Sequence, residues 1–282
     1  MHLSLILFAL GLAWSIRCVA LQSSGTWQER WHRALGQFLV PPLLLLMTGL
    51  AVLCMGIDGS MLGLPAGWIG YLIAISFLGC ALGLNLYLAW QGWRSLQQVQ
   101  TYPAVAFNGQ SGRLLETPDL FAAQIGFWRP QLVLSAGLLQ TLPPNQLHAV
   151  LIHEQAHSHY RDTFCFFWFG WIRQLTFWLP NTAVLWQELL TLRELRADRW
   201  AAQRVDPLVL AESLLVVVQA PLINPAPYCA ALGSQASSTQ LEERINALLI
   251  DTELEPAPIT NPLSWRWLFL SVLPLLSILL HS

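Results

Sequence analysis

The residues best suited to chemistry lie in one short segment, His153-Glu154-Gln155-Ala156-His157. On a helix, positions i and i+4 share a face, so His153 and His157 can direct two imidazole nitrogens at one metal ion. Glu154 projects about a third of a turn away, where its carboxylate can reach a water molecule on that ion. The spacing therefore predicts a zinc site with Glu154 as the general base.

A catalytic zinc ion takes three protein ligands and leaves its fourth position to water, and a carboxylate is an accepted third ligand. Glu194 is the best candidate, because Asp198 follows it at i+4 on the same helical face. We therefore predict that His153, His157 and Glu194 bind the metal, while Asp198 accepts a hydrogen bond from a ligand histidine. The alternative is a solvated helix face on which both carboxylates pair with arginines. Three arginines interleave with them: Arg193, Arg196 and Arg199.

The composition is typical of a membrane protein. Hydrophobic residues make up 55% of the 282-residue chain and charged residues only 11%, whereas soluble domains carry about 25% charged residues. The lipid bilayer is therefore an expected partner. The formal net charge of -2 gives no reason to expect direct contact with nucleic acid.

Four apolar stretches are candidate membrane spans, because about 20 apolar residues cross the hydrocarbon core. The last of the four is shorter than this. Arg30 and Arg33 follow the first stretch and Arg94 follows the third, whereas the loop between the second and third has no Arg or Lys. Arginine-rich loops lie on the cytoplasmic side, so we expect the large central region to be cytoplasmic. The four stretches run near His2–Val19, Phe38–Gly56, Trp68–Trp90 and Trp267–Leu280.

The central region, between the third and fourth stretches, combines short strands with helices. Pro103–Phe107 and Gln131–Ser135 favour strands, and Asn108-Gly109 is one of the turn signals between them. Pro143-Pro144 predicts the start of the helix that carries the two histidines, because proline suits the first helical turn. Two later helices, separated by loop-like sequence at Asn224–Ser238, are expected at Leu208–Ala220 and Thr239–Leu249.

The aromatic-rich segment from Phe164 to Trp186 cannot cross the bilayer once, because His153 and Glu194 would then lie on opposite sides. Pro180-Asn181 divides this segment into two pieces, each too short to span comfortably. We predict a helical hairpin that lies in the membrane surface or enters the bilayer and returns. An ordinary buried hairpin of the central region is the alternative.

Several motifs together resemble the M56 family of membrane-embedded zinc metallopeptidases, which includes antibiotic-response receptors, and more distantly the M48 family. The resemblance implies Zn2+ bound by His153, His157 and Glu194, a general base at Glu154, and a gluzincin-like fold. It also implies that Gln131–Ser135 is an edge strand that pairs with an extended substrate. The motifs are Gly126–Pro130 with Leu132–Ser135, His153–His157 with Arg161-Asp162, Arg193-Glu194 with Ala197-Asp198, and Leu241–Ile245.

These patterns predict a mainly α membrane protein of about four transmembrane helices, with a cytoplasmic, gluzincin-like α+β zinc peptidase domain inserted between the third and fourth. The expected parts are a three-helix transmembrane region at 1–92, the peptidase domain at 93–261 with a membrane-associated hairpin near 164–186, and a C-terminal transmembrane helix at 262–282.

The expected function is that of a multi-pass endopeptidase of the bacterial inner (plasma) membrane. Its partner would be a cytoplasmic or membrane-adjacent protein substrate, with a transcriptional repressor as one candidate. The alternative is a non-catalytic membrane receptor or scaffold that retains a zinc site. Glu154 favours the enzyme, since a purely structural site does not require it.

Overall fold

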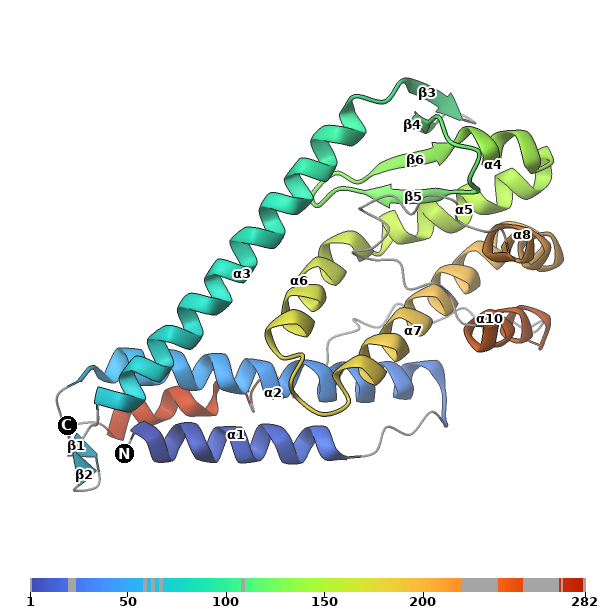
Figure 1. The fold of residues 1–282 in the computed structure, drawn as a ribbon. Coiled ribbons are helices and arrows are strands. Elements are labelled where there is room, and N and C mark those ends of the chain that lie inside the picture. The colour runs from blue at the N-terminus through green and yellow to red at the C-terminus, as the bar shows by residue number, and fades with distance from the viewer. Residues whose placement is uncertain are drawn as a thin grey trace. The chain divides into compact units, whose positions relative to one another are not determined.

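A computed structural model gives the fold of the chain (Figure 1). It describes residues 2–19, 24–57, 60–61, 64–65, 68–107, 110–219, 238–250, 269 and 271–280. The chain forms two compact units. We call Met1–Leu88, Trp171–Leu189 and Thr260–Ser282 the apolar unit, and Ala89–Gly170 and Leu190–Ile259 the sheet unit. The predicted domain boundaries at 92 and 261 stay predictions.

Helices dominate the apolar unit: α1 (His2–Cys18), α2 (Trp27–Met55) and the first part of α3 (Trp68–Gln100). A capping box starts α2, because the Thr26 hydroxyl accepts a hydrogen bond from the Glu29 N–H at 3.4 Å and the Glu29 carboxylate accepts one from the Thr26 N–H at 3.0 Å. Two short antiparallel strands, β1 (Ser60–Met61) and β2 (Leu64–Pro65), precede α3.

Two helices, α2 and α3, are long and apolar enough to cross a membrane. The first predicted span corresponds to α1, which has only 17 residues. Part of the fourth, Trp267–Leu280, lies outside the described residues, and its described end is the 3-10 helix η1 (Leu273–Leu280). The structure therefore supports two candidate spans, and a total of about four is not shown.

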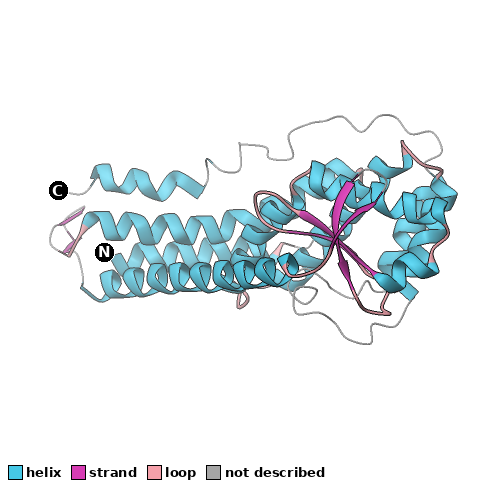
Figure 2. Cartoon of the chain, turned by 90° about the horizontal axis from the view of Figure 1, so that it is seen from above, coloured by secondary structure: helices cyan, strands magenta, loops and turns pink. Residues whose placement is uncertain are grey.

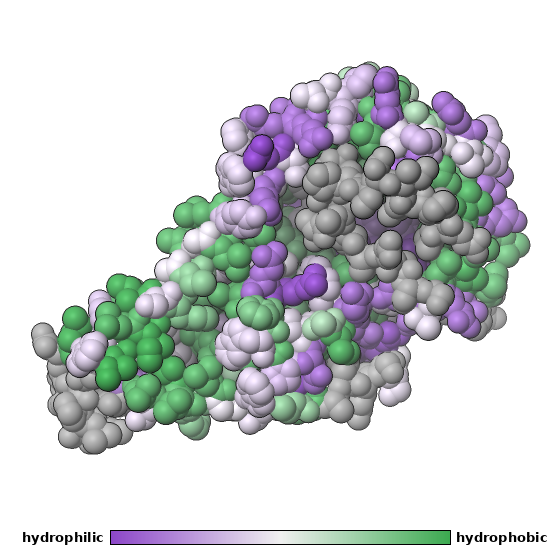
Figure 3. Space-filling view, in the orientation of Figure 1, coloured by the Kyte–Doolittle hydropathy of each residue, from purple (hydrophilic) through white to green (hydrophobic). Residues whose placement is uncertain are grey.

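Of the two candidate spans, α3 has the more exposed apolar surface. Only 11% of its most apolar 18-residue window is buried, against 61% for α2. Leu82 and Leu86 are each 61% exposed, and hydrophobic residues line this helix in Figure 3. A contiguous apolar surface of this kind is unfavourable in water and marks a contact with lipid or protein.

The predicted hairpin consists of α6 (Asp162–Leu175) and α7 (Thr182–Ala202). Its turn contains Asn181, whose φ of 56° lies in the left-handed region that asparagine tolerates. The break at Pro180-Asn181 is therefore where the sequence predicts it. The tip, Trp171–Leu189, belongs to the apolar unit, and its entry into a bilayer stays a prediction.

A buried arginine of α1 holds this tip. The Nη2 atom of Arg17 donates to the carbonyl of Phe38 at 3.0 Å, an oxygen without its usual helical donor because Pro42 has no N–H. The Nη1 atom donates to the Thr182 hydroxyl at 3.2 Å, and the Asn181 amide donates to the Arg17 carbonyl at 2.8 Å. Three segments that are distant in sequence thus meet at one side chain.

A second contact fixes the first half of α7. Arg30 of α2 donates from Nε to Glu188 Oε1 at 2.8 Å and from Nη2 to Glu188 Oε2 at 3.1 Å. Such a two-point pair constrains direction as well as distance. The N-terminal half of α7 is therefore attached to the apolar helices, and its C-terminal half lies in the sheet unit.

The sheet unit contains one four-stranded sheet in the order β3-β4-β6-β5. Its strands are coloured magenta in Figure 2, where they overlap in the view. The central pair, β4 and β6, is parallel with Gly112 opposite Leu132, and both outer pairs are antiparallel. The strands are β3 (Ala104–Phe107), β4 (Gln110–Leu115), β5 (Ala122–Ile125) and β6 (Gln131–Ser135).

Two of these strands, β3 and β6, confirm the predictions at Pro103–Phe107 and Gln131–Ser135, although the turn signal Asn108-Gly109 lies outside the described residues. The predicted position of β6 is wrong, however. It lies between β4 and β5 and is not an edge strand. Leu132, Val133 and Leu134 are all buried, at 3%, 0% and 0% exposure, so both faces of β6 are covered, as expected of a central strand with a continuous apolar run.

Helices α4 (Ala136–Thr141) and α5 (Pro144–His159) pack on this sheet, α8 (Pro207–Gln219) packs on α5, and α10 (Ser238–Ile250) packs on α8. Pro143 is the N-cap of α5, as the paired prolines predict. The helices predicted at Leu208–Ala220 and Thr239–Leu249 are confirmed, whereas the loop predicted from Asn224 lies outside the described residues. A mainly α chain with two long apolar helices before a mixed α+β domain is therefore confirmed.

Candidate metal centre

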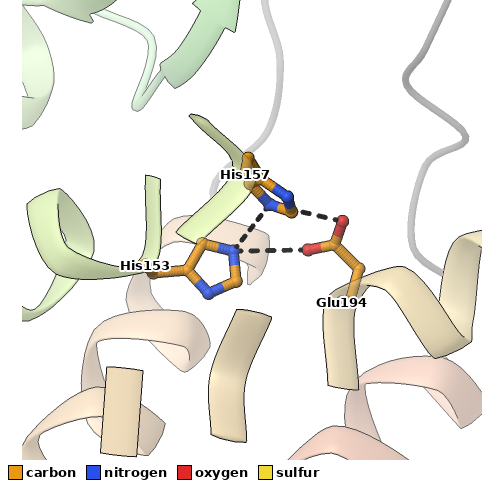
Figure 4. A group of neighbouring side chains, drawn as sticks. All are labelled: His153, His157 and Glu194. Atoms are coloured by element: carbon orange, nitrogen blue, oxygen red, sulfur yellow. Dashed lines mark hydrogen bonds and ion pairs between the residues drawn. The ribbon is translucent and has the colours of Figure 1, made fainter. Parts of the chain in front are cut away.

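Three side chains from α5 and α7 converge on one point (Figure 4). The Nε2 atoms of His153 and His157 lie 3.2 Å apart. The carboxylate of Glu194 lies 3.4 Å from the first of these nitrogens and 3.7 Å from the second. Two imidazole nitrogens and one carboxylate, with their ligand atoms within 4.8 Å of one another, fit a zinc ion that keeps a position for water.

The local sequence explains why these donors face inward. His153 and His157 share the face of α5 that also buries Ala149 and Val150, so core packing turns both rings away from solvent. Glu194 follows a run of α7 that is buried on all sides, Leu189–Leu192. The predicted ligand set is thus brought together by two helices whose apolar residues fix their rotation.

Each histidine has its own aspartate. Nδ1 of His153 lies 2.9 Å from Oδ1 of Asp198, and the orienting role of Asp198 stays a prediction. Nδ1 of His157 lies 2.8 Å from Oδ2 of Asp162, a residue to which the sequence patterns gave no role beyond its place in the motif Arg161-Asp162. A carboxylate at Nδ1 favours the tautomer with its proton there, so Nε2 is the nitrogen that can bind a metal. Asp162 also pairs with Arg196.

Two arginines surround the carboxylates of α7. Arg193 donates from Nε and Nη2 to Oε1 of Glu194, at 2.9 and 2.7 Å. Arg244 donates from Nε and Nη2 to Asp198, at 2.7 and 2.8 Å. The solvated helix face considered as an alternative is excluded for Asp198, which is only 2% exposed. Sequence reasoning did not assign a role to Arg244, although an arginine between apolar helix positions is a signal for a buried partner.

These contacts set the charge of the site. Burial opposes the charge of Glu194, but Arg193, His157 and Arg244 lower its pKa well below the ordinary value. Burial likewise opposes ionisation of Asp198, but Arg244 and His153 lower its pKa. Both carboxylates are therefore ionised at neutral pH, the form in which Glu194 can bind a cation.

The pKa of His153 moves in the opposite direction from that of the carboxylates. Burial disfavours its charged form, but the contacts with Asp198 and Glu194 outweigh burial and raise the pKa to about 10. In the metal-free protein this ring therefore holds a proton at neutral pH. A metal ion that binds at Nε2 has to displace it.

Glu154 is buried on α5 directly after His153. Burial disfavours the charge of Arg244, but the carboxylates of Asp198, Glu194 and Glu154 together raise its pKa above the ordinary value. The carboxylate of Glu154 therefore contributes to the electrostatic environment of this guanidinium.

The protein-family model of Peptidase family M48 matches residues 109–249, which is half of the 282-residue chain. No curated protein matches the chain. The motifs resemble M56 first and M48 more distantly, whereas the match is with M48. The matched region contains His153, His157 and Glu194, so the chain belongs to peptidase family M48 and is a zinc metallopeptidase.

Proposed function

We propose that the chain is a membrane-anchored endopeptidase that cleaves a cytoplasmic or membrane-adjacent protein. The observation that carries this proposal is the convergence of two imidazoles and a carboxylate beside the buried Glu154. A transcriptional repressor as substrate depended on the M56 resemblance, and the M48 match adds no support for it.

In this proposal the metal and the residues around it have separate roles in peptide hydrolysis. A bound zinc ion polarises the scissile carbonyl and lowers the pKa of a water molecule towards about 7. Glu154 takes the proton of the attacking water and delivers it to the leaving amine. Asp198 and Asp162 hold the two ligand rings at Nδ1, at 2.9 and 2.8 Å, so that both Nε2 atoms stay aimed at one point.

The substrate strand pairs with β5 in this proposal, not with β6. Among the described residues, no strand pairs with the outer edge of β5, and this strand packs against α5, the helix of the two histidines. The Ser135 N–H of β6 donates to the Phe121 carbonyl, just before β5. In an antiparallel pair every second residue bonds to the partner strand, so Ala122 and Gln124 direct their backbone N–H and C=O groups away from β6, to the outer edge. An extended peptide can add there as a further strand.

The anchor consists of α2 and α3, which cross the bacterial inner membrane with the sheet unit in the cytoplasm. The exposed apolar surface of α3 supports this assignment. Arg30, Arg33 and Arg94 lie at the ends of the apolar stretches that would face the cytoplasm. In this arrangement α1 and the segment from Trp267 supply the remaining spans, and the tip of the α6–α7 hairpin enters the bilayer and returns.

The test compares full-length wild type with Glu154→Gln and His157→Ala, purified in detergent. An unfolded, fluorescently labelled protein serves as the probe, and bound zinc is measured by elemental analysis. Glu154→Gln should retain zinc and lose about 10²- to 10⁴-fold in turnover, because only the proton transfer is removed. His157→Ala should lose zinc as well. Gln155→Ala, an exposed neighbour on α5, is the matched control and should behave as wild type.

The physiological substrate is then sought by comparing the proteins of cells that produce wild type or Glu154→Gln. A protein that accumulates intact only with the variant identifies the substrate. Equal turnover by wild type and Glu154→Gln would overturn the role of Glu154. A wild type that binds zinc but cleaves neither the probe nor any cellular protein would instead support the non-catalytic receptor or scaffold.

A further inference from the structure

Arg244 occupies an unusual position for an arginine. It lies on the face of α10 that also carries Leu241 and Leu248, and the three residues are 5%, 8% and 6% exposed. The two leucines pack into a core cluster with Ala201 of α7 and Leu210 of α8. This packing fixes the rotation of α10, so the guanidinium is directed into the protein. A buried arginine is tolerated only where its donors find acceptors.

The acceptors belong to two different carboxylates. Nε and Nη2 form a two-point hydrogen-bonded pair with Asp198, at 2.7 and 2.8 Å. Nη1 lies 3.4 Å from Oε2 of Glu194. Glu194 and Asp198 are one helical turn apart on α7, a spacing at which like charges repel. One planar guanidinium therefore balances both charges and sets the directions of both side chains.

This arrangement reaches the metal ligands by two routes. Oδ1 of Asp198 accepts from Arg244 and also lies 2.9 Å from Nδ1 of His153. The other route is direct, since Glu194 is itself a ligand. Removing a group that orients a ligand typically weakens metal binding by about 10- to 100-fold.

We infer that Arg244 is a positioning residue of the zinc site, which acts through Asp198 and Glu194 and not on the substrate. The inference rests on the zinc site used in the proposed function. A purely structural ion pair between α7 and α10 is the competing explanation. That explanation predicts lower stability of the metal-free protein, whereas positioning predicts weaker metal binding and an altered coordination geometry in a protein that is still folded.

The experiment uses the full chain in detergent with Arg244→Gln and Arg244→Lys. Glu242→Gln, an exposed residue of the same helix, is the matched control. Zinc affinity is measured by competition with a chromophoric chelator, coordination geometry by the visible absorption of the Co2+-substituted protein, and folding by circular dichroism of the metal-free protein.

For Arg244→Gln we expect zinc binding about 10- to 100-fold weaker than wild type, together with changed Co2+ absorption bands. Arg244→Lys should recover part of the affinity, because an ammonium group keeps the charge but cannot reproduce the two-point geometry. Glu242→Gln should match wild type in every measurement.

An Arg244→Gln protein that is folded, binds zinc within twofold of wild type and keeps its Co2+ spectrum would overturn the inference. If Arg244→Gln does not fold, Arg244→Lys decides: weaker zinc binding supports positioning, and unchanged binding refutes it. Loss of folding in both variants would also refute it, because Arg244 would then be a structural residue. Failure of the zinc site itself is recognised separately, by wild type and His157→Ala binding zinc equally.

Discussion

Oδ2 of Asp162 lies 2.8 Å from Nδ1 of His157, although the two residues belong to different helices. Only Tyr160 and Arg161 connect α5 to α6, and Arg161 adopts a φ of 54°. This tight connection reverses the chain so that the first residue of α6 faces the ring that α5 has just presented. One short turn therefore both starts a helix and orients a metal ligand.

Asp162→Asn should weaken zinc binding by about 10- to 100-fold and lower kcat/KM in parallel, because a neutral amide no longer fixes the proton on Nδ1 of His157. Chelator competition and steady-state cleavage measure the two effects. Asp206→Asn is the control: Asp206 is an exposed residue that accepts the Leu208 N–H at 2.9 Å, a role that asparagine also performs. Wild-type affinity in Asp162→Asn would show that the contact is incidental.

Zinc binding should become tighter as pH rises through the neutral range. Without metal, the pKa of His153 is about 10, so zinc displaces one proton at any pH below that value, and the apparent Kd should fall about tenfold per pH unit. Calorimetry in buffers of different ionisation enthalpy measures the released proton directly. An apparent Kd that does not change with pH would contradict the raised pKa.

The same pKa shift has a second consequence with a definite sign. A raised folded-state pKa stabilises the metal-free fold fully below the ordinary value of 6.5 and loses this contribution as pH rises to about 10. Thermal unfolding of the metal-free protein should therefore show a stabilising contribution that disappears over this range. Asp198→Asn removes one of the two carboxylates that raise the pKa and should reduce the dependence.

The outer edge of β5 offers a test of substrate pairing. Gln124→Pro removes an outward-facing backbone N–H without removing a bond to β6, and proline is tolerated on edge strands. We expect kcat/KM to fall at least about tenfold with zinc content unchanged, since only backbone pairing with the substrate is lost. Gln124→Ala keeps the backbone N–H and should retain full activity. Equal activity of the two variants would place the substrate elsewhere.

The contacts that hold the hairpin tip can be tested by removing the hydroxyl group of Thr182. Thr182 is 5% exposed; its hydroxyl oxygen accepts from Arg17, and its single O–H is shared between the carbonyls of Thr176 and Leu179. Thr182→Val removes a buried acceptor of Arg17 Nη1 and a buried donor to the Leu179 carbonyl, so the free energy of unfolding should fall by about 1–3 kcal/mol, measured by thermal unfolding in detergent.

Thr101→Val is the matched control for this prediction. The Thr101 hydroxyl also donates to a backbone carbonyl, that of Gln98 at 2.7 Å, but at an exposed position. Water replaces the lost bond there, so little change in stability is expected. Similar losses of stability in both variants would show that burial at the hairpin tip is not what makes the Thr182 contacts important.

The zinc ligands were predictable because the informative spacings are local: His153 and His157 share one helix, and Glu194 is followed one turn later by Asp198 on another. The role of Arg244 was not, since it meets Asp198 across 46 positions and only tertiary packing of α10 brings it there. Within the sheet, likewise, one strand was predictable from the sequence and another was not. β6 has a buried apolar pattern, whereas β5 is the short sequence Ala-Ala-Gln-Ile, whose strand conformation comes from pairing with β6 and not from propensity.

Helix α7 is uninterrupted from Thr182 to Ala202. Its first turns are tied to Arg17 and Arg30, and its last turns carry the groups that face the histidines. Opening the middle of this helix would break contacts on both sides at once, so its backbone amides should exchange with deuterium only when much of the protein unfolds. We therefore expect the amides of Leu189–Leu192 to be among the slowest to exchange, so that a segment of low mobility lies next to a metal ligand.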